Sequence, residues 1–323
     1  MDRPREIVVS CRAWRAFILV AVLIIGGCFG RHKWEPTIQD HELSLPQHSL
    51  PEVGSVSGGF RGDQHAMLSA DTSLRVNAVW TPIGHGRAFT EGYFPLQFYE
   101  PFRQLKVIDN QRIYTAKHFS VFLPEHEDIS AAGEVWRIDV KRAAQFLTQF
   151  HPAISTHINS TGRLSGPDGG FAIVRALSPD YVEIAFRIHA EIEPEEGVFY
   201  TPAHFSGFMT INKQTKRVER FRLAIPTESL NATLTVALPT EALVDIVHVE
   251  RMELSGSLPD ANASIPWMDE IDEAEAALRL KRLFYGFMEI KWVPFEQAVA
   301  IAQTERRPLF AVVLWGRLDE QSC

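Results

Sequence analysis

The chain has 323 residues, of which 46% are hydrophobic and 22% are charged. This composition excludes a wholly disordered chain, and the length accommodates two domains at roughly 150 residues each. The formal net charge of -8 at pH 7 excludes nucleic acid from the expected partners, because phosphate binding requires a basic surface.

The N-terminal segment predicts transfer of the protein across a membrane. Arginines precede an apolar stretch at residues 16–29, which is shorter than the roughly 20 residues that span a bilayer as a helix. This length favours a signal peptide at residues 1–30, and a signal-anchor remains the alternative if Trp14 and Arg15 extend the span. Because the basic flank stays in the cytoplasm, both readings place the body on the far side of the membrane.

Two kinds of short motif bear on the compartment. Residues 25–28, Ile-Gly-Gly-Cys, resemble a bacterial lipoprotein box, so Cys28 is a lipidation candidate. Three sequons make Asn159, Asn231 and Asn262 glycosylation candidates. We therefore expect a membrane-tethered protein that faces the endoplasmic reticulum lumen in a eukaryote, or the periplasm or other extracytoplasmic space in a bacterium, there as a lipoprotein.

Cysteine is scarce in this chain. The three cysteines are Cys11, Cys28 and Cys323. Because none lies between residues 28 and 323, the body cannot form an internal disulfide and its fold must rest on packing.

The middle of the chain predicts strands. Residues 31–70 are polar and read as a tether, and residues 71–265 are expected to form a strand-rich extracytoplasmic α+β domain. Residues 181–191 alternate apolar with polar side chains, which predicts a half-buried strand. A turn at 178–180 pairs this strand with residues 171–177, a turn at 212–215 joins strands at 205–211 and 217–225, and a further strand is expected at 245–254. These hairpins indicate an antiparallel sheet, curved or sandwiched.

Helices are expected on the flanks of this sheet. Asp139 can cap a helix over residues 140–150, a second helix is expected over 269–284, and a third opens at Pro294. The acidic residues that begin the second helix lack the glycine of a calcium loop, and negative charge suits a helix N-terminus. We therefore predict no metal site.

The end of the chain predicts the start of a second domain. Residues 309–315 are an apolar run with the length of a fully buried strand, and a short loop then leads to Ser322 and Cys323. A helix, a buried strand and a loop ending in Ser-Cys are typical of a thioredoxin-like domain. We expect residues 266–323 to be the helices and first strand of such an α/β domain, truncated at an in-frame UGA codon directly after Cys323. The predicted fold class is thus α+β, an antiparallel strand-rich domain with flanking helices, followed by this truncated domain.

From about residue 110 onward the sequence resembles the selenoprotein N family. The tail at residues 314–323 is similar to the family segment that runs directly into selenocysteine and glycine. Other matching segments, in the family's order, are residues 117–119 (KHF), 122–124 (FLP), 150–152 (FHP), 186–191 (FRIHAE), 202–207 (PAHFSG) and 221–223 (FRL).

This resemblance implies a membrane-tethered thiol/selenol oxidoreductase that acts on protein disulfides or thiols. Cys323 would be the resolving thiol next to the selenocysteine, and the polypeptide that ends at Cys323 is expected to be inactive by itself. Ser322 is expected to cap the helix that follows the redox pair. Trp315 is either a wall of the redox site or a core residue, with equal weight on each reading.

The resemblance also implies partners and a physiological role. In animals the family takes part in redox control of calcium homeostasis, so a membrane calcium pump is an expected partner. No EF-hand calcium loop is found, and no cofactor other than selenocysteine is expected. His118, His189 and His204 are interpreted as ordinary core or surface histidines rather than metal ligands. The alternative function is a non-enzymatic extracytoplasmic binding module with a vestigial redox tail.

Overall fold

The computed structural model describes residues 67–84, 96–125, 129–158, 169–227, 231–237, 242–261, 264–286, 293–306 and 308–309. The chain divides into two compact units. One unit combines Met1–Ser57 with Trp292–Leu318, and its described helix is α7 (Phe295–Glu305). The other unit contains Gly58–Lys291 and Asp319–Cys323. All remaining described helices and strands belong to this second unit, which we call the body.

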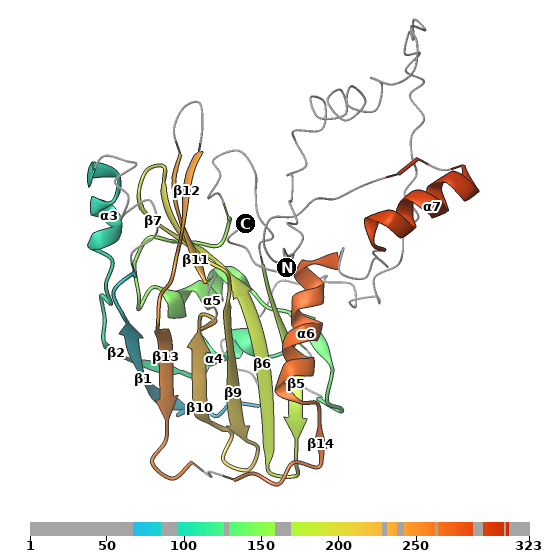
Figure 1. The fold of residues 1–323 in the computed structure, drawn as a ribbon. Helices are drawn as coiled ribbons and strands as arrows, with labels where there is room; N and C mark the ends of the chain where they lie inside the picture. Colours follow the sequence, from blue (N-terminus) through green and yellow to red (C-terminus); the bar gives the residue numbers. More distant parts are fainter. Residues whose placement is uncertain are drawn as a thin grey trace, which may run out of the picture. The chain divides into compact units, whose positions relative to one another are not determined.

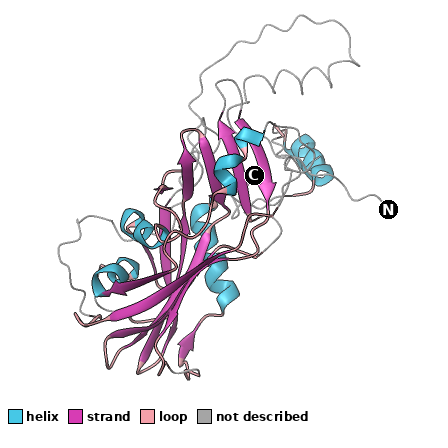
Figure 2. Ribbon diagram, turned by 90° about the vertical axis from the view of Figure 1, so that its left-hand side faces the viewer, coloured by secondary structure: helices cyan, strands magenta, loops and turns pink. Residues whose placement is uncertain are grey.

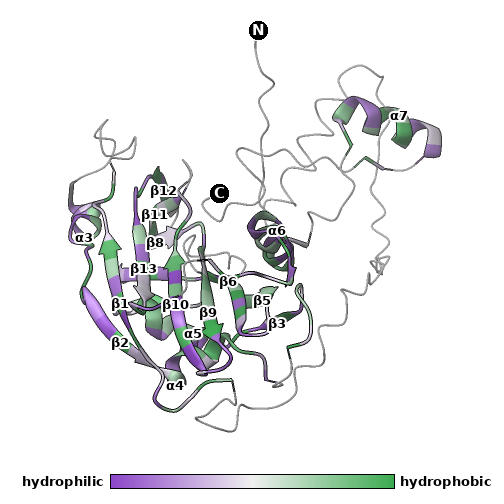
Figure 3. Cartoon of the chain, turned by 90° about the horizontal axis from the view of Figure 1, so that it is seen from below, coloured by the Kyte–Doolittle hydropathy of each residue, from purple (hydrophilic) through white to green (hydrophobic). Residues whose placement is uncertain are grey.

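The larger sheet of the body has nine strands, and every strand pair described in it is antiparallel. In spatial order the strands are β14 (Asp269–Glu270), β5 (Gly169–Leu177), β6 (Tyr181–His189), β9 (Phe205–Asn212), β10 (Arg217–Ala224), β13 (Met252–Ser257), β1 (Ser73–Trp80) and β2 (Gln111–Thr115), and β3 (Val135–Arg137) pairs with β5. Alternating hydrophobic and hydrophilic residues along several of these strands are visible in Figure 3.

A smaller sheet of five strands adjoins the larger one (Figure 2). Its order is β12 (Ala242–Val247), β11 (Ala232–Ala237), β8 (Val198–Pro202), β7 (Glu191–Glu195) and β4 (Ile154–Ser155). One long hairpin belongs to both sheets, because β6 continues past Ala190 as β7, and β8 continues past Ala203 and His204 as β9. The sheets therefore meet at a corner made by continuous chain.

Helices cover both faces of the larger sheet (Figure 1). On one face lie α4 (Ala116–Phe119), the 3-10 turn η3 (Ser120–Phe122) and α5 (Val140–Leu147), whose aromatic side chains join the main core. On the opposite face α6 (Glu273–Phe284) packs against β5 and β6, where Ala276 and Leu280 are buried with Phe171 and Ile173. The short elements η2 (Leu96–Phe98) and α3 (Glu100–Arg103) lie beside the smaller sheet.

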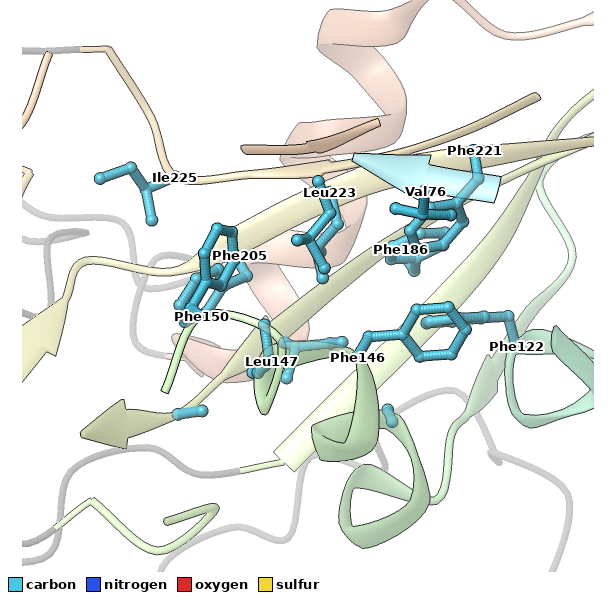
Figure 4. Packing of buried hydrophobic residues seen from close by; sticks show 14 of the residues in the cluster. Val76, Phe122, Phe146, Leu147, Phe150, Phe186, Phe205, Phe221, Leu223 and Ile225 are labelled. Atoms are coloured by element: carbon cyan, nitrogen blue, oxygen red, sulfur yellow. The ribbon is translucent and has the colours of Figure 1, made fainter. Parts of the chain in front are cut away.

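Aromatic side chains fill the main core (Figure 4). Phe122 stacks on Phe186 of β6 with ring centroids 4.2 Å apart. Phe146 of α5 contacts Phe221 of β10, with centroids 4.9 Å apart. Truncating a buried phenylalanine of this kind to alanine typically costs about 3–5 kcal/mol. This packing holds α5 and η3 on the sheet without any disulfide.

The predicted hairpins are confirmed. The turn after Leu177 joins β5 to β6, and the turn after Asn212 joins β9 to β10. Asn212 forms the second turn through its side-chain Oδ1, which accepts hydrogen bonds from the backbone N–H groups of Gln214 and Thr215. The strand-rich antiparallel α+β fold follows from these pairings.

Several predicted boundaries are wrong. The single strand expected at residues 245–254 is two strands, β12 and β13, that belong to different sheets. The helix that Asp139 caps ends at Leu147, before residue 150. Asp269 and Glu270, expected in the second helix, pair with β5 as β14, and Asp272 is the residue that caps α6, through a 2.6 Å hydrogen bond from the Glu275 N–H. At residues 245–254 and 269–270, strand pairing with distant segments overrides the local pattern.

The described part of the chain includes no helix that has both the length and the apolar character needed to cross a bilayer. The expected signal or anchor at 1–30, most of the expected tether and residues 310–315 of the expected strand lie outside the described residues. Of the expected thioredoxin-like domain at 266–323, the structure describes residues 266–286, 293–306 and 308–309, which include α6 and α7.

Candidate functional site

Most of the site residues predicted from sequence lie outside the described residues. These are the redox candidates Cys323, Ser322 and Trp315, the lipidation candidate Cys28, and the glycosylation candidates Asn159 and Asn262.

Asn231 is the glycosylation candidate that the structure does describe. It is fully buried. Its side-chain Nδ2 donates to the backbone oxygens of Pro226 and Val249, and its Oδ1 accepts a 2.9 Å hydrogen bond from the Val249 N–H. The amide that would carry a glycan is therefore part of the bonding that holds the chain between β12 and β13, and the folded body leaves no room for a sugar there.

The three histidines noted in the sequence occupy two separate places. His118 lies in α4, where its Nδ1 accepts a 3.0 Å hydrogen bond from the Thr115 N–H at the start of the helix. His189 ends β6, and His204 lies just before β9 at the corner of the two sheets. The rings of His189 and His204 are 6.5 Å apart, centroid to centroid. The sequence suggested three scattered histidines, and the fold brings two of them together.

The alternation in β6 divides its side chains between two different environments. Phe186 and Ile188 point into the aromatic core, together with Ala190 just beyond the strand. Arg187, His189 and Glu191 belong to the opposite face, and all three are buried there, at 5%, 0% and 0% exposure. The prediction of a half-buried strand is therefore wrong for this end, because α6 and the residues after it cover the second face.

Arg187 is enclosed by aromatic rings at the end of α6. Its guanidinium carbon lies 5.4 Å from the ring centroid of Phe284 and 5.5 Å from that of Tyr285. Its Nε donates a 2.9 Å hydrogen bond to His189 Nε2, so this nitrogen of His189 carries a lone pair and the imidazole is neutral in this arrangement. The His189 ring in turn stacks on Phe284 with centroids 3.7 Å apart.

The second guanidinium nitrogen of Arg187, Nη2, is buried and has no hydrogen-bond partner among the described residues. Burial lowers the pKa of this guanidinium below its ordinary value, and the nearby Tyr285 opposes that shift. Arginine nevertheless keeps its proton in proteins, so the charge remains. Burying an unpaired charge costs several kcal/mol, and stacking on aromatic rings returns about 0.5–2 kcal/mol.

Arg175 provides a direct comparison on the same face of the larger sheet. It is 9% exposed, close to the 5% of Arg187. Arg175 forms ion pairs with Glu183 through Nε and with Glu270 through Nη1, the latter at 3.1 Å. No such carboxylate pairs with Arg187 in the described part of the chain. The two buried arginines thus differ in charge compensation, although their burial is similar.

His204 adds a second buried group that lacks a partner. Its Nδ1 is buried and makes no hydrogen bond to any described residue. The pKa of His204 lies well below its ordinary value, first because of burial and then because of the nearby positive charges, of which that of Arg187 is the largest contributor and that of Lys281 a smaller one. We call Arg187, His189, His204 and Lys281 the basic cluster. Burial and the neighbouring positive charges both favour the neutral form of His204.

A carboxylate lies further along the same edge. Glu191 is fully buried, and its Oε2 accepts a 3.3 Å hydrogen bond from the Thr201 hydroxyl across the hairpin. The described residues contain no group of three or more acidic, histidine or cysteine side chains that could hold a metal ion. With hydrogen-bond donors in excess, the basic cluster is suited to an anion rather than to a cation.

A hollow elsewhere in the body has a different character. It lies between α3 and the strands β11 and β12, with an interior volume of about 20 Å³, room for about one water molecule. Its lining is mostly apolar and includes Phe98, Tyr99, Phe102, Leu234 and Val236. This hollow is too small to hold a substrate.

Sequence reasoning missed the basic cluster for a physical reason. The alternating pattern shows that Arg187, His189 and Glu191 share a face, which was the available signal. It does not show that the end of α6, about a hundred residues later in the chain, closes over that face. Charged residues on one side of a strand normally face water.

Comparisons with known proteins gave one consistent result. No model of a protein family matches the chain, and no solved structure matches it. Selenoprotein N of zebrafish (Danio rerio) is 27% identical over 263 residues, covering 65% of this chain and 47% of the relative. Human selenoprotein N is 27% identical over 271 residues, covering 65% and 44%, and mouse selenoprotein N is 28% identical over 215 residues, covering 55% and 37%. The chain thus spans about half the length, or less, of the curated relatives it matches.

Proposed function

The chain is a member of the selenoprotein N family, and we propose that its gene product is a thiol/selenol oxidoreductase that acts on protein disulfides or thiols. The observation that carries the proposal is Cys323, a thiol preceded by a tail that resembles the family's approach to selenocysteine. The relatives are named as selenoproteins, which supports a selenocysteine as the partner of this thiol.

The proposed exchange assigns one role to Cys323. A substrate disulfide is opened when one of its sulfurs forms a bond to selenium, which releases the other sulfur as a thiolate. The Cys323 thiolate then attacks the selenium–sulfur bond and closes a bond to selenium. The second substrate sulfur leaves as a thiolate, so the substrate has gained two electrons and the pair has lost two. A dithiol reductant must return two electrons to the pair before the next cycle.

The surroundings of the pair are proposed from the thioredoxin-like reading of residues 266–323. A helix that starts after the pair would direct its free N–H groups and partial positive charge toward the thiolate, which lowers the pKa of such a thiol. Ser322 would cap that helix through its hydroxyl. Trp315, at the end of the expected strand, would wall the redox centre or pack in the core below it.

The N-terminal segment and the family resemblance support a proposed location and proposed partners. We propose that residues 1–30 tether or export the protein and leave the body outside the cytoplasm, in the endoplasmic reticulum lumen of a eukaryote or in an extracytoplasmic space of a bacterium. A membrane calcium pump is the proposed partner in a eukaryotic host, with a role in calcium homeostasis. Protein thiols and disulfides are the proposed substrates in either host.

A binding module is the second candidate function. It is favoured by the sequence of the body, which has no cysteine between residues 28 and 323. A domain without thiols cannot itself carry out disulfide exchange. On this view the strand-rich body recognises a partner, and the redox tail contributes nothing.

The test begins with the transcript downstream of the Cys323 codon. A UGA codon, an open frame that starts with glycine and a selenocysteine insertion element are expected. The encoded product, expressed with selenocysteine, should reduce a protein disulfide such as that of insulin in the presence of a dithiol. Cys323→Ser should lose this turnover, whereas Cys11→Ser should keep it. A UAA or UAG codon without coding continuation, or equal activity in Cys323→Ser, would leave the binding module as the function.

A further inference from the structure

We propose that the basic cluster at the corner of the two sheets is a binding site for a small oxyanion or carboxylate, held by Arg187 and His204. This site does not involve Cys323. It uses the end of α6, which lies within the range expected for the thioredoxin-like domain but packs on the larger sheet of the body. It is therefore independent of the proposed redox function, and either can fail without the other.

Arg187 carries a buried positive charge. Its side chain is 5% exposed, and its Nη2 has no acceptor among the described residues. Its neighbours are the rings of Phe284 and Tyr285 and the neutral edge of His189. The rings stack on the cation, His189 accepts one hydrogen bond, and the nearby Tyr285 hydroxyl favours the charged guanidinium without forming a hydrogen bond to Nη2, but none of these groups carries a negative charge. An anion at Nη2 would supply both the acceptor and the charge.

His204 has a buried ring nitrogen close to the same place. Its Nδ1 is buried and without a described partner, and its ring lies 6.5 Å from that of His189, which is itself bonded to Arg187. In the tautomer with a proton on Nδ1, His204 donates to an acceptor. Two open donors, one on β6 and one on His204 just before β9, thus lie near the same histidine, His189. A ligand with two oxygens on one centre can accept from both.

Arg175 and Arg187 differ in the charges that surround them. This sequence does compensate a buried arginine on the same sheet face, since Arg175 pairs with Glu183 and Glu270. At the corner, by contrast, the charges that act on His204 are the positive charges of Arg187 and of Lys281 in α6. The excess of donors is local to the corner and is not a general property of this face.

The experiment uses the full chain and inorganic phosphate as the probe. Thermal unfolding is measured as phosphate replaces chloride at constant ionic strength, with acetate in a parallel series. We expect phosphate, acetate or both to raise the Tm of the wild-type chain by roughly 2–8 °C, because a ligand that binds the folded state stabilises it. The anion that raises the Tm more identifies the ligand class as oxyanion or carboxylate.

Matched variants locate the effect. Arg187→Met keeps the length of the side chain without its charge, and the anion-dependent rise in Tm should disappear. Arg175→Met removes an equally buried arginine that already has carboxylate partners, so it should lower the Tm but keep the anion-dependent rise. An equal rise in wild type and Arg187→Met would overturn the proposal, as would the absence of any rise in wild type at millimolar anion.

A second measurement does not depend on the folding of Arg187→Met. The imidazole resonances of wild-type protein are followed by NMR as a function of pH, and the His204 signal is assigned with His204→Gln. Bound anion should raise the pKa of His204, because it adds negative charge beside the ring. A His204 titration that is identical with and without phosphate and acetate would contradict the site.

Discussion

Gly207 has no space for a side chain in the folded body. A Cβ at this position would lie 1.9 Å from the backbone oxygen of Arg222 and 2.8 Å from the ring of Phe186. Gly207 pairs with Leu223 in the register of β9 and β10. Position 207 therefore requires glycine, because the backbone of β10 and the ring of Phe186 occupy the space of a side chain.

We expect Gly207→Ala to destabilise the body by about 1–3 kcal/mol or more, because the strand must shift to admit a methyl group. Chemical denaturation of the two proteins measures the difference. The control is Gly286→Ala, where an added Cβ meets nothing within 4 Å. Equal stability of Gly207→Ala and wild type would show that β9 and β10 do not pack as described.

At the level of single residues, the sequence predicted roles that depend on neighbours in the chain and missed those that depend on distant segments. Asp139 caps α5 as expected, since its Oδ1 accepts from the backbone N–H groups of Lys141 and Arg142. The sequon at Asn231 predicts an exposed side chain, yet Asn231 is buried and hydrogen-bonded to Val249. Nothing in a three-residue motif reports such a contact.

Among the elements, α6 determines whether the basic cluster is enclosed. Leu280 is 3% exposed and packs with Ala276 on Phe171 and Ile173 of β5. One turn later, Phe284 contacts Phe171 edge-to-face at 5.1 Å and stacks on His189. The anchoring of the helix on β5 therefore also positions the ring that covers Arg187 and His189.

Leu280→Ala is expected to lower the free energy of unfolding by about 2–5 kcal/mol, the usual cost of a cavity at a buried leucine. It should also speed amide hydrogen exchange in α6 more than in β9 and β10, because α6 opens locally before the sheet does. Ala277→Gln on the exposed face of α6 serves as the control and should change stability by less than about 0.5 kcal/mol. Uniform acceleration of exchange across the body would instead indicate that α6 and the sheet open together.

Residues 245–254 were expected to form one strand, but they contribute to two strands, β12 and β13. Val247 and Val249 are both buried, so the alternating pattern runs through the point where the chain leaves β12. The chain crosses from one sheet to the other there, held by Asn231. Periodicity reports which side chains are buried and does not report which sheet buries them.

For the whole molecule, buried histidines couple stability to pH. The pKa values of His118 and His151 are lowered mainly by burial, and that of His204 is lowered by burial and by the basic cluster. In the unfolded chain a histidine titrates near 6.5. Below that pH the unfolded state takes up protons that the folded state resists, so the folded state loses stability as the pH falls through about 6.5.

We therefore expect the free energy of unfolding, measured in buffers without phosphate or acetate, to decrease from pH 7.5 to pH 5.5. His204→Gln should reduce this slope by the amount that corresponds to the uptake of up to one proton on unfolding. A slope that is the same in His204→Gln would mean that His204 takes up its proton equally in both states.

The class of the body, an antiparallel strand-rich α+β fold, could be predicted because its hairpins are local and carry clear turn residues. The division into two sheets could not, because β6 and β7 read as one continuous strand pattern. The redox residues were proposed from the tail and the family, and they remain predictions. The basic cluster required the folded structure, since its members come from β6, the link between β8 and β9, and α6.

The position of β13 has a consequence for how this protein is made. This strand lies between β10 and β1, and it pairs with both. While the ribosome is still synthesising the residues before Met252, β1 and β10 cannot be joined, and both keep an unpaired edge. Pairings between such distant segments form slowly. The growing chain is therefore expected to need chaperones that shield strand edges until residue 257 has emerged, and a nascent chain stalled before that point is the form most exposed to aggregation.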